Sequence, residues 1–389
     1  MRKAKRIEKI PLYLFAEIDK KKAEAQARGV NIIDLSIGDP DQPTPHHILE
    51  KFHEAVNNPQ THNYPPYEGI SEFRKAVAHW YKKRFNVDLD PEKEVLSLIG
   101  SKEGIAHIFL ALIDPGDYAL IPDPAYPVYK IWTHLAGGKP YLLPLKRKNN
   151  FLPDLTKIRP TVLPKAKLLF INYPNNPTAA VTDRNFYEEV VALAKEHNFL
   201  ICSDLAYSEV SFDGYKPMSI LEIPGAKEVA IEFHSLSKTY NMTGWRIGMA
   251  VGNEEAMAAL SVIKTNADSG VFKAIQYAAV EALTGPQDSV EKMKTLYARR
   301  RDILIDGLNS LGWKLEKTKA TFYVWVPVPR GYTAEKFAAE LLEKTGVLVV
   351  PGSGYGQYGE GYVRFSITIA EERIAEAVER MRKHGIKFS

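Results

Sequence analysis

The chain has 389 residues, of which 45% are hydrophobic and 25% charged, and its formal net charge at pH 7 is +4. This length accommodates two domains with a large core, and the small, scattered positive charge argues against nucleic acid as the main partner. Because no apolar stretch suits a membrane span or a signal peptide, and the single cysteine, Cys202, excludes an internal disulfide, we expect a cytoplasmic protein without membrane contact.

Between residues 35 and 285, short apolar runs alternate with segments of helical periodicity. The runs are rich in β-branched and aromatic residues and almost continuously apolar, as strands covered on both faces are. A helix is expected over residues 184–196, with Asp183 as its N-cap. This alternation predicts an α/β fold with a mainly parallel sheet. The expected strands are residues 95–99, 118–122, 168–172, 199–204, 229–233 and 247–251.

The pattern changes in the last hundred or so residues, where helices and strands no longer alternate regularly. We predict three units: an N-terminal arm and small-domain segment (1–34), a large domain (35–285) and a small α+β C-terminal domain (286–389). The expected helices of the small domain are residues 288–308, 334–344 and 370–384, and its expected strands are 314–317, 321–326, 347–350 and 362–367.

A lysine in the run from Ser235 to Gly248 is the most informative functional feature. Lys238 is flanked by hydroxyl side chains and followed by Arg246. An aldehyde cofactor needs a lysine amine for its Schiff base. A phosphate group needs small hydroxyls, such as those of Ser235 and Ser237, and a forked guanidinium. The alternative for a short Ser-x-Ser-Lys pattern alone is a solvated lysine in a polar loop.

Polar side chains also follow three of the expected strands. Asp204 ends one strand, with Tyr207 just beyond it, and Asn176 lies in a turn after another. Ligands of open α/β sheets collect at these carboxyl ends, although a helix cap or an ordinary Asn-Pro turn is the alternative. Ser101 and Lys102 lie in a Gly/Ser loop that opens a helix and could bind phosphate through free N–H groups.

Together these segments resemble the fold-type I enzymes that use pyridoxal 5′-phosphate, specifically the class I and II aminotransferases. The resemblance covers nearly the whole chain. It implies an α/β large domain with the three-layer architecture of these transferases and a mainly parallel sheet, beside a smaller α+β domain. It also implies amino-acid and 2-keto-acid substrates, pyridoxal 5′-phosphate as the cofactor, and no metal.

The resemblance assigns catalysis to Lys238, Asp204 and Tyr207. Lys238 would form the Schiff base, Asp204 would pair with the pyridine nitrogen, and Tyr207 would bond the phenolic oxygen of the ring, as would Asn176. Tyr126 would stack on the ring, with core aromatic packing as the alternative. The implied cofactor-binding residues are Ser101, Lys102, Tyr126, Asn176, Asp204, Tyr207, Ser235, Ser237, Lys238, Arg246 and Tyr64.

Tyr64 would reach the cofactor phosphate of a neighbouring subunit, which implies a homodimer with shared active sites. The alternative is a surface tyrosine in a Pro-rich loop. Arg364 would grip the substrate α-carboxylate with its planar fork, unless it is a solvated edge residue. The implied substrate-binding residues are Gly38, Arg364, Asn176, Tyr13 and Lys102.

Longer segments look like the bacterial LL-diaminopimelate aminotransferases, notably residues 10–18, 99–106, 170–180 and 233–246. That branch converts tetrahydrodipicolinate and glutamate to LL-diaminopimelate and 2-oxoglutarate in lysine biosynthesis. Recognition of the distal amine stays open, because plant-type enzymes carry a glutamate where Tyr67 stands. Aspartate, alanine or aromatic aminotransferases, a carbon–sulfur lyase on the same fold, and a non-enzymatic regulator are the alternatives, which fold alone does not separate.

Overall fold

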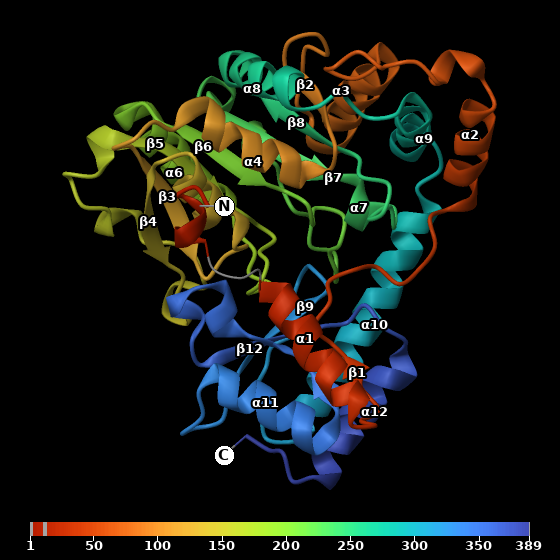
Figure 1. Cartoon of the computed structure of the whole chain (residues 1–389), viewed down its shortest axis with the longest axis vertical. Coiled ribbons are helices and arrows are strands. Elements are labelled where there is room, and N and C mark those ends of the chain that lie inside the picture. Colours follow the sequence, from red (N-terminus) through yellow and green to blue (C-terminus); the bar gives the residue numbers. More distant parts are fainter. Residues whose placement is uncertain (1–2, 11–13, 389) are drawn as a thin grey trace.

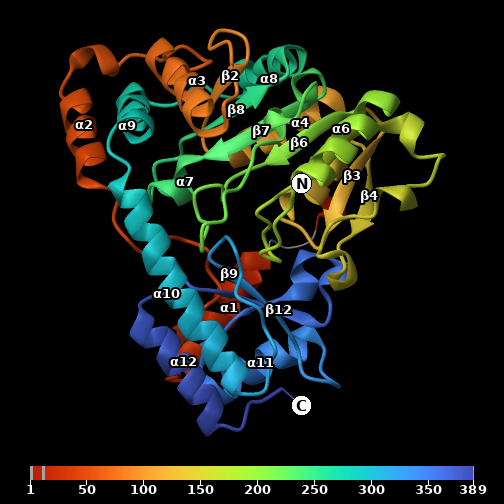
Figure 2. The same cartoon turned by 180° about the vertical axis from the view of Figure 1, so that it is seen from behind.

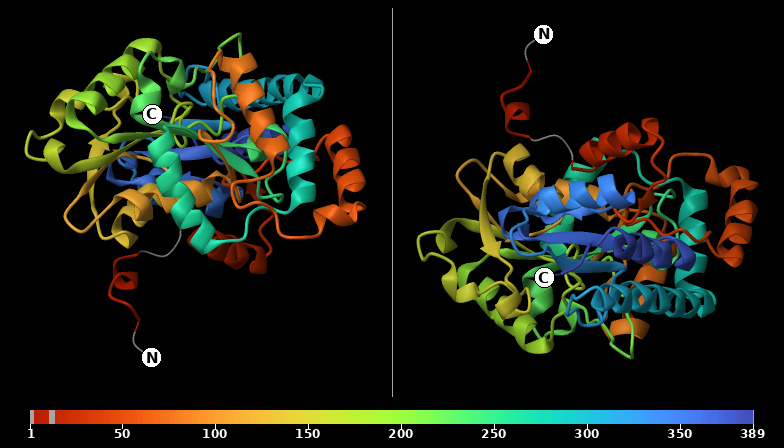
Figure 3. Two further views of the ribbon diagram at one scale, coloured as in Figure 1. Left: turned by 90° about the horizontal axis from the view of Figure 1, so that it is seen from above. Right: turned by 90° about the horizontal axis from the view of Figure 1, so that it is seen from below.

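The computed structural model describes residues 3–10 and 14–388. The chain forms a larger part around one wide sheet and a smaller part below it, and helix α10 (Asp288–Ser310) runs from one to the other (Figures 1 and 2). Residues 3–10, which include a short 3₁₀ turn at Ile7–Lys9, project away from both parts (Figure 3). Within the described ranges, no helix is both long and apolar enough to cross a lipid bilayer.

A mostly parallel sheet forms the centre of the larger part and confirms the predicted α/β class. Its seven strands among the described residues run in the order β2-β8-β7-β6-β5-β3-β4. Only β8 runs antiparallel to its neighbours there. The strands are β2 (Val95–Leu98), β3 (Tyr118–Asp123), β4 (Lys139–Pro144), β5 (Ala166–Ile171), β6 (Leu200–Asp204), β7 (Ala230–Ser235) and β8 (Gly248–Gly252).

Helices cover both faces of this sheet, which explains the continuous apolarity of its strands. Along β5, Leu168 and Phe170 join one hydrophobic cluster, whereas Leu169 and Ile171 join another on the opposite face. The expected cap is present, because Asp183 accepts a hydrogen bond from the N–H of Phe186. The helices are α2 (His46–Val56), α3 (Ser71–Phe85), α4 (Ser101–Leu112), α5 (Val128–Leu135), α6 (Arg184–His197), α7 (Leu236–Thr239), α8 (Glu254–Ala267) and α9 (Lys273–Thr284).

The smaller part contains a sheet of order β11-β12-β9 and a short pair, β1-β10. The expected strand over residues 347–350 divides between them, because Val347 pairs with Ile33 and Val350 pairs with Arg364. The remaining elements are β1 (Ile33–Asp34), β9 (Tyr323–Pro327), β10 (Val347–Leu348), β11 (Val350–Pro351), β12 (Tyr362–Ser366), α11 (Ala334–Thr345) and α12 (Glu371–Lys383).

At the margins of the sheets, one predicted strand is absent and one observed strand was not predicted. Residues 314–317 form no strand, although all are described. The side chain of Asn309 hydrogen-bonds both the N–H and the C=O of Leu315, so this backbone does not pair with a strand. Strand β4 is not among the strands expected from the sequence, and Pro140 and Pro144 lie within it. Prolines are tolerated there because β4 is an edge strand.

Helix α1 (Leu14–Ala27) lies against the smaller part (Figure 1). Its Ile18 and Ala25 belong to a cluster that includes Trp325 and Leu342. Helix α1 is thus packed against the smaller part through apolar contacts.

Candidate active site

A cavity of about 300 Å³ lies between the two parts, where the carboxyl ends of β5, β6 and β7 face the smaller sheet. It draws on segments far apart in the sequence. Its lining residues are Ile37, Gly38, Ser101, Lys102, Ile105, Tyr126, Asn172, Asn176, Asp204, Ala206, Tyr207, Ser235, Ser237, Lys238, Thr243, Arg246, Tyr323 and Arg364. Every site residue expected from the sequence is among them except Tyr64 and Tyr13.

Lys238 lies on the single helical turn α7, directly after β7. Ser235 caps this turn by accepting a hydrogen bond from the N–H of Ser237. The Lys238 ammonium donates to the carbonyl oxygen of Gly38 at 2.8 Å. Burial lowers the pKa of Lys238 to about 8; Asp39 opposes this effect, and the positive charge of Arg246 adds to it. About half of the amine is therefore uncharged and available as a base at pH 8.

Asp204, the last residue of β6, is buried at the floor of the cavity. Its Oδ2 accepts a hydrogen bond of 2.6 Å from the hydroxyl of Tyr129. Its Oδ1 is buried and makes no hydrogen bond with any residue that the structure describes. Burial raises the pKa of this carboxyl to about 6. An unpaired buried carboxylate oxygen is costly, so its position fits a ligand that brings an N–H donor to it.

Arg364 enters the cavity from β12, the central strand of the smaller sheet. It is fully buried, which excludes the solvated edge residue that the sequence left open. Its Nη1 donates to Asn176 Oδ1 at 2.8 Å, and its Nη2 donates to the carbonyl oxygen of Ser36 at 2.6 Å. The guanidinium also lies 4.0 Å from the ring centroid of Tyr323. These contacts fix the plane of a cationic fork suited to a carboxylate.

Small polar groups and an arginine gather at the other end of the cavity. Ser101 begins helix α4, and Gly100 before it has a φ of 71°. This φ favours glycine, and a Cβ at Gly100 would lie 2.2 Å from Arg246 Nη2 and displace the guanidinium. The helix N-terminus, the hydroxyls of Ser235 and Ser237 and the guanidinium together suit a phosphate group.

Two aromatic residues of the site were not found from the sequence. Tyr323 lines the cavity, and its hydroxyl lies 3.0 Å from that of Tyr207. A Cβ at Gly38 would lie 1.9 Å from the same hydroxyl. The hydroxyl of Tyr129 donates a hydrogen bond to Asp204, and its ring stacks on Phe170. Tyr323 lies in the strand expected over residues 321–326, whereas Tyr129 lies in helix α5, which was not predicted. Nothing in the local sequence of either residue separates it from core aromatics.

Tyr64 does not reach the cavity of its own chain. It is 84% exposed, on the loop between residues 62 and 70. Tyr13 lies outside the described residues. Tyr126 lines the cavity edge-on to Tyr129, with ring centroids 5.9 Å apart.

Known proteins match the chain over most or all of its length. The family "aminotransferase class I and II" matches residues 30–381. The LL-diaminopimelate aminotransferase of Moorella thermoacetica is 57% identical over 383 residues, covering 98% of each chain. The protein of the same name from Halothermothrix orenii is 56% identical and covers 100% of each chain. Substrate-bound BacF from Bacillus subtilis superposes with a TM-score of 0.96 at 40% identity, covering 100% of this chain and 99% of that one.

Proposed function

The chain belongs to the class I and II aminotransferase family, and we propose that it transfers an amino group between LL-diaminopimelate and 2-oxoglutarate, with pyridoxal 5′-phosphate as its cofactor. The observation that carries the chemistry is the cavity that joins Lys238, the unpaired oxygen of Asp204 and the fork of Arg364. The names of full-length relatives support the choice of substrate and its place in lysine biosynthesis.

The residues present fit this cofactor. When bound, pyridoxal 5′-phosphate supplies an aldehyde that bonds an amine and a ring that accepts the electrons released at the substrate Cα. Asp204 Oδ1 would receive the ring N–H, which satisfies the buried oxygen that otherwise lacks a donor among the described residues. Tyr126, Asn176 and Tyr207 would contact the ring. The phosphate would be held by Ser101, Lys102, Ser235, Ser237 and Arg246.

Arg364 would bind the substrate, and Lys238 would transfer its proton. The planar guanidinium of Arg364, held by Asn176 and Ser36, would bind the α-carboxylate, with Gly38 beside it. The amine of Lys238, with its pKa lowered to about 8, would take the proton from Cα of the amino donor. In the second half-reaction it would deliver a proton to Cα of the acceptor. Lys102, exposed at the rim, would face the distal end of a long substrate.

We further propose a cytoplasmic homodimer with shared sites. Tyr64 is exposed in the single chain although it is aromatic, and Tyr67 on the same loop is 45% exposed. Phe272 is exposed as well. Contiguous exposed apolar surface favours contact with another subunit, and Gly270, two residues before Phe272, packs against Pro65 of the Tyr64 loop. Tyr64 would then complete the phosphate site of the second subunit.

The substrate proposal is tested by initial rates with 2-oxoglutarate as acceptor and LL-diaminopimelate, aspartate, alanine or phenylalanine as donor. LL-diaminopimelate should have the highest kcat/KM. An aspartate or aromatic donor that wins by roughly tenfold, about 1.4 kcal/mol of transition-state binding, would reject this substrate but leave the aminotransferase assignment in place. In a separate assay with an amino acid that carries sulfur at Cβ, such as cystathionine, release of a thiol, ammonia and pyruvate without glutamate would indicate the carbon–sulfur lyase instead.

A further inference from the structure

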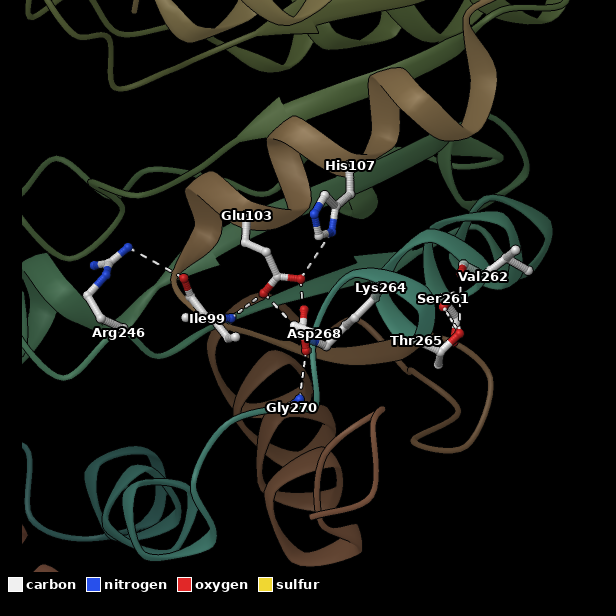
Figure 4. Close-up of polar contacts among 10 residues, drawn as sticks. All are labelled: Ile99, Glu103, His107, Arg246, Ser261, Val262, Lys264, Thr265, Asp268 and Gly270. Atoms are coloured by element: carbon white, nitrogen blue, oxygen red, sulfur yellow. Dashed lines mark hydrogen bonds and ion pairs between the residues drawn. The ribbon is translucent and has the colours of Figure 1, made fainter. Parts of the chain in front are cut away.

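A buried group of charges lies behind the phosphate end of the active site (Figure 4). Lys264, on α8, has a side chain that is 0% exposed. Its ammonium lies 3.1 Å from Glu103 Oε1 on α4 and 3.0 Å from both carboxylate oxygens of Asp268. A buried ammonium is stable only when it is paired in this way. None of the three residues lines the cavity described above.

The carboxylates of the cluster are already paired with a cation, the ammonium of Lys264. Glu103, His107 and Asp268 bring ligand atoms within 4.8 Å of one another, as a metal site would. The ammonium of Lys264 already lies among these carboxylates, so the group has a resident positive charge. Although burial works in the opposite direction, the hydrogen bond from His107 and the charge of Lys264 hold the pKa of Glu103 below its ordinary value. The carboxylate therefore stays charged at neutral pH.

Glu103 connects the cluster to the phosphate-binding turn. Its Oε2 accepts a hydrogen bond of 2.5 Å from the N–H of Ile99. The carbonyl oxygen of Ile99 lies 3.5 Å from Arg246 Nη2 (Figure 4). Ile99 is thus bonded to Glu103 through its N–H, and its carbonyl oxygen faces Arg246, the arginine proposed to bind the phosphate. Ser101 follows two residues later, so the position of Ile99 sets where the turn presents its hydroxyl.

Asp268 connects the same cluster to the loop that carries Tyr64. Its Oδ1 accepts a hydrogen bond of 2.7 Å from the N–H of Gly270, which has a φ of 83°. A Cβ at Gly270 would lie 2.9 Å from Pro65 Cγ, so this glycine packs directly against the loop. Pro65 is the neighbour of Tyr64. The cluster therefore supports both the phosphate turn of its own site and the loop proposed to complete the second site.

We propose that Glu103, Lys264 and Asp268 are positioning residues that hold the phosphate-binding turn and couple it to the Tyr64 loop. The inference rests on the proposed function, because it assumes that the turn binds the phosphate of pyridoxal 5′-phosphate. One cluster on each subunit would then support two sites of the dimer. It would hold the phosphate-binding turn of its own site and the Tyr64 loop that completes the other site. Loss of a charge in the cluster should therefore weaken cofactor binding without touching any cofactor-binding side chain.

The first test is a spectroscopic titration of the apoprotein with pyridoxal 5′-phosphate. Glu103→Gln and Asp268→Asn should each raise the dissociation constant roughly tenfold, a coupling typical of linked networks. Inorganic phosphate should compete less well in both variants. Arg301→Met is the matched control, because Arg301 is a buried arginine paired with Asp213, outside the cavity. It should lower Tm and leave the dissociation constant within about twofold of wild type.

The second test is a double-mutant cycle between Asp268→Asn and Tyr64→Phe, read from the same dissociation constant. Coupling predicts that Asp268→Asn costs less affinity when Tyr64 is already changed. Additive effects would overturn the link to the Tyr64 loop. Affinities within about twofold of wild type in both cluster variants, with Tm lowered as in the Arg301 control, would overturn the whole inference.

The outcomes separate this inference from the proposed function. If the wild-type apoprotein does not bind pyridoxal 5′-phosphate, the proposed function itself fails. If Glu103→Gln does not fold, Asp268→Asn still decides the question, because Lys264 keeps Glu103 as its partner in that variant.

Discussion

The ammonium of Lys238 donates a hydrogen bond of 2.8 Å to the carbonyl oxygen of Gly38, a residue 200 positions earlier in the chain. Gly38 in turn lies against Tyr323 of the smaller part, where any side chain would collide with the tyrosine hydroxyl. Three segments that meet only in the folded protein therefore position the amine of Lys238. This arrangement fixes the amine at the cavity and leads to the first prediction.

Replacing Lys238 by alanine should abolish nearly all transamination. The variant loses the amine proposed to move the proton at Cα, and a general acid–base group of this kind contributes roughly 10²- to 10⁴-fold. The visible absorbance that arises when the cofactor bonds to this lysine should also disappear. Purified variant protein, assayed for turnover and for its absorption spectrum, tests both. Retention of turnover and absorbance would show that another residue has this role.

The rate at which apoprotein incorporates pyridoxal 5′-phosphate should rise with pH through about 8. The uncharged amine is the nucleophile, and burial lowers the pKa of Lys238 from its ordinary 10.5 to about 8. Below that pH the amine is protonated and slow; above it the rate should level off. Stopped-flow absorbance between pH 6.5 and 9.5 measures the midpoint. A rate that still climbs at pH 9.5 would contradict the lowered pKa.

Arg364→Met should shift that same midpoint to higher pH, because the charge of Arg364 contributes to lowering the pKa of Lys238. For catalysis, Arg364→Lys is the sharper change. It keeps the charge but loses the planar fork, so kcat/KM should fall by roughly ten- to a hundredfold for every amino acid alike. Parallel assays with LL-diaminopimelate and alanine test this. A loss confined to one substrate would place Arg364 elsewhere on the substrate.

Tyr129→Phe should lower kcat by roughly tenfold and leave KM for the amino donor nearly unchanged. The change removes only the hydroxyl that bonds Asp204 Oδ2, and the ring can still stack on Phe170. Asp204 would then be harder to ionise, which weakens its pairing with the cofactor ring. Tyr173→Phe is the control, since it removes a buried hydroxyl bonded to a backbone carbonyl away from the cavity. Equal effects of both changes on kcat would argue against a positioning role for Tyr129.

Mixed dimers of Tyr64→Phe and Lys238→Ala subunits should recover activity. If sites are shared, one site of the heterodimer carries both lesions and the other carries neither. Each homodimer, by contrast, has the same lesion in both sites. Mixed and separate samples are compared at equal total protein. Activity of the mixture no higher than the average of the two separate samples would count against shared sites.

Much of the site was predictable because its chemistry lies in short local patterns. The hydroxyl-flanked Lys238, the Asp204–Tyr207 pair and the glycine-opened turn at Ser101 each follow a strand whose apolar run is visible in the sequence. The strands around them formed as predicted, since continuous apolarity at this length suits a strand covered on both faces. Parallel strands place their carboxyl ends at one edge, so these motifs meet without further information.

Long-range packing decided the rest. Tyr323 and Tyr129 became part of the site because distant strands and helices bring them to Tyr207 and Asp204, respectively. The expected strand at residues 314–317 is absent from this described segment because the side chain of Asn309 hydrogen-bonds both the N–H and the C=O of Leu315. Whether a backbone or a hydroxyl finds its partner depends on contacts between segments far apart in the chain. Local sequence patterns set backbone preference and amphipathicity, but only the folded structure determines those contacts.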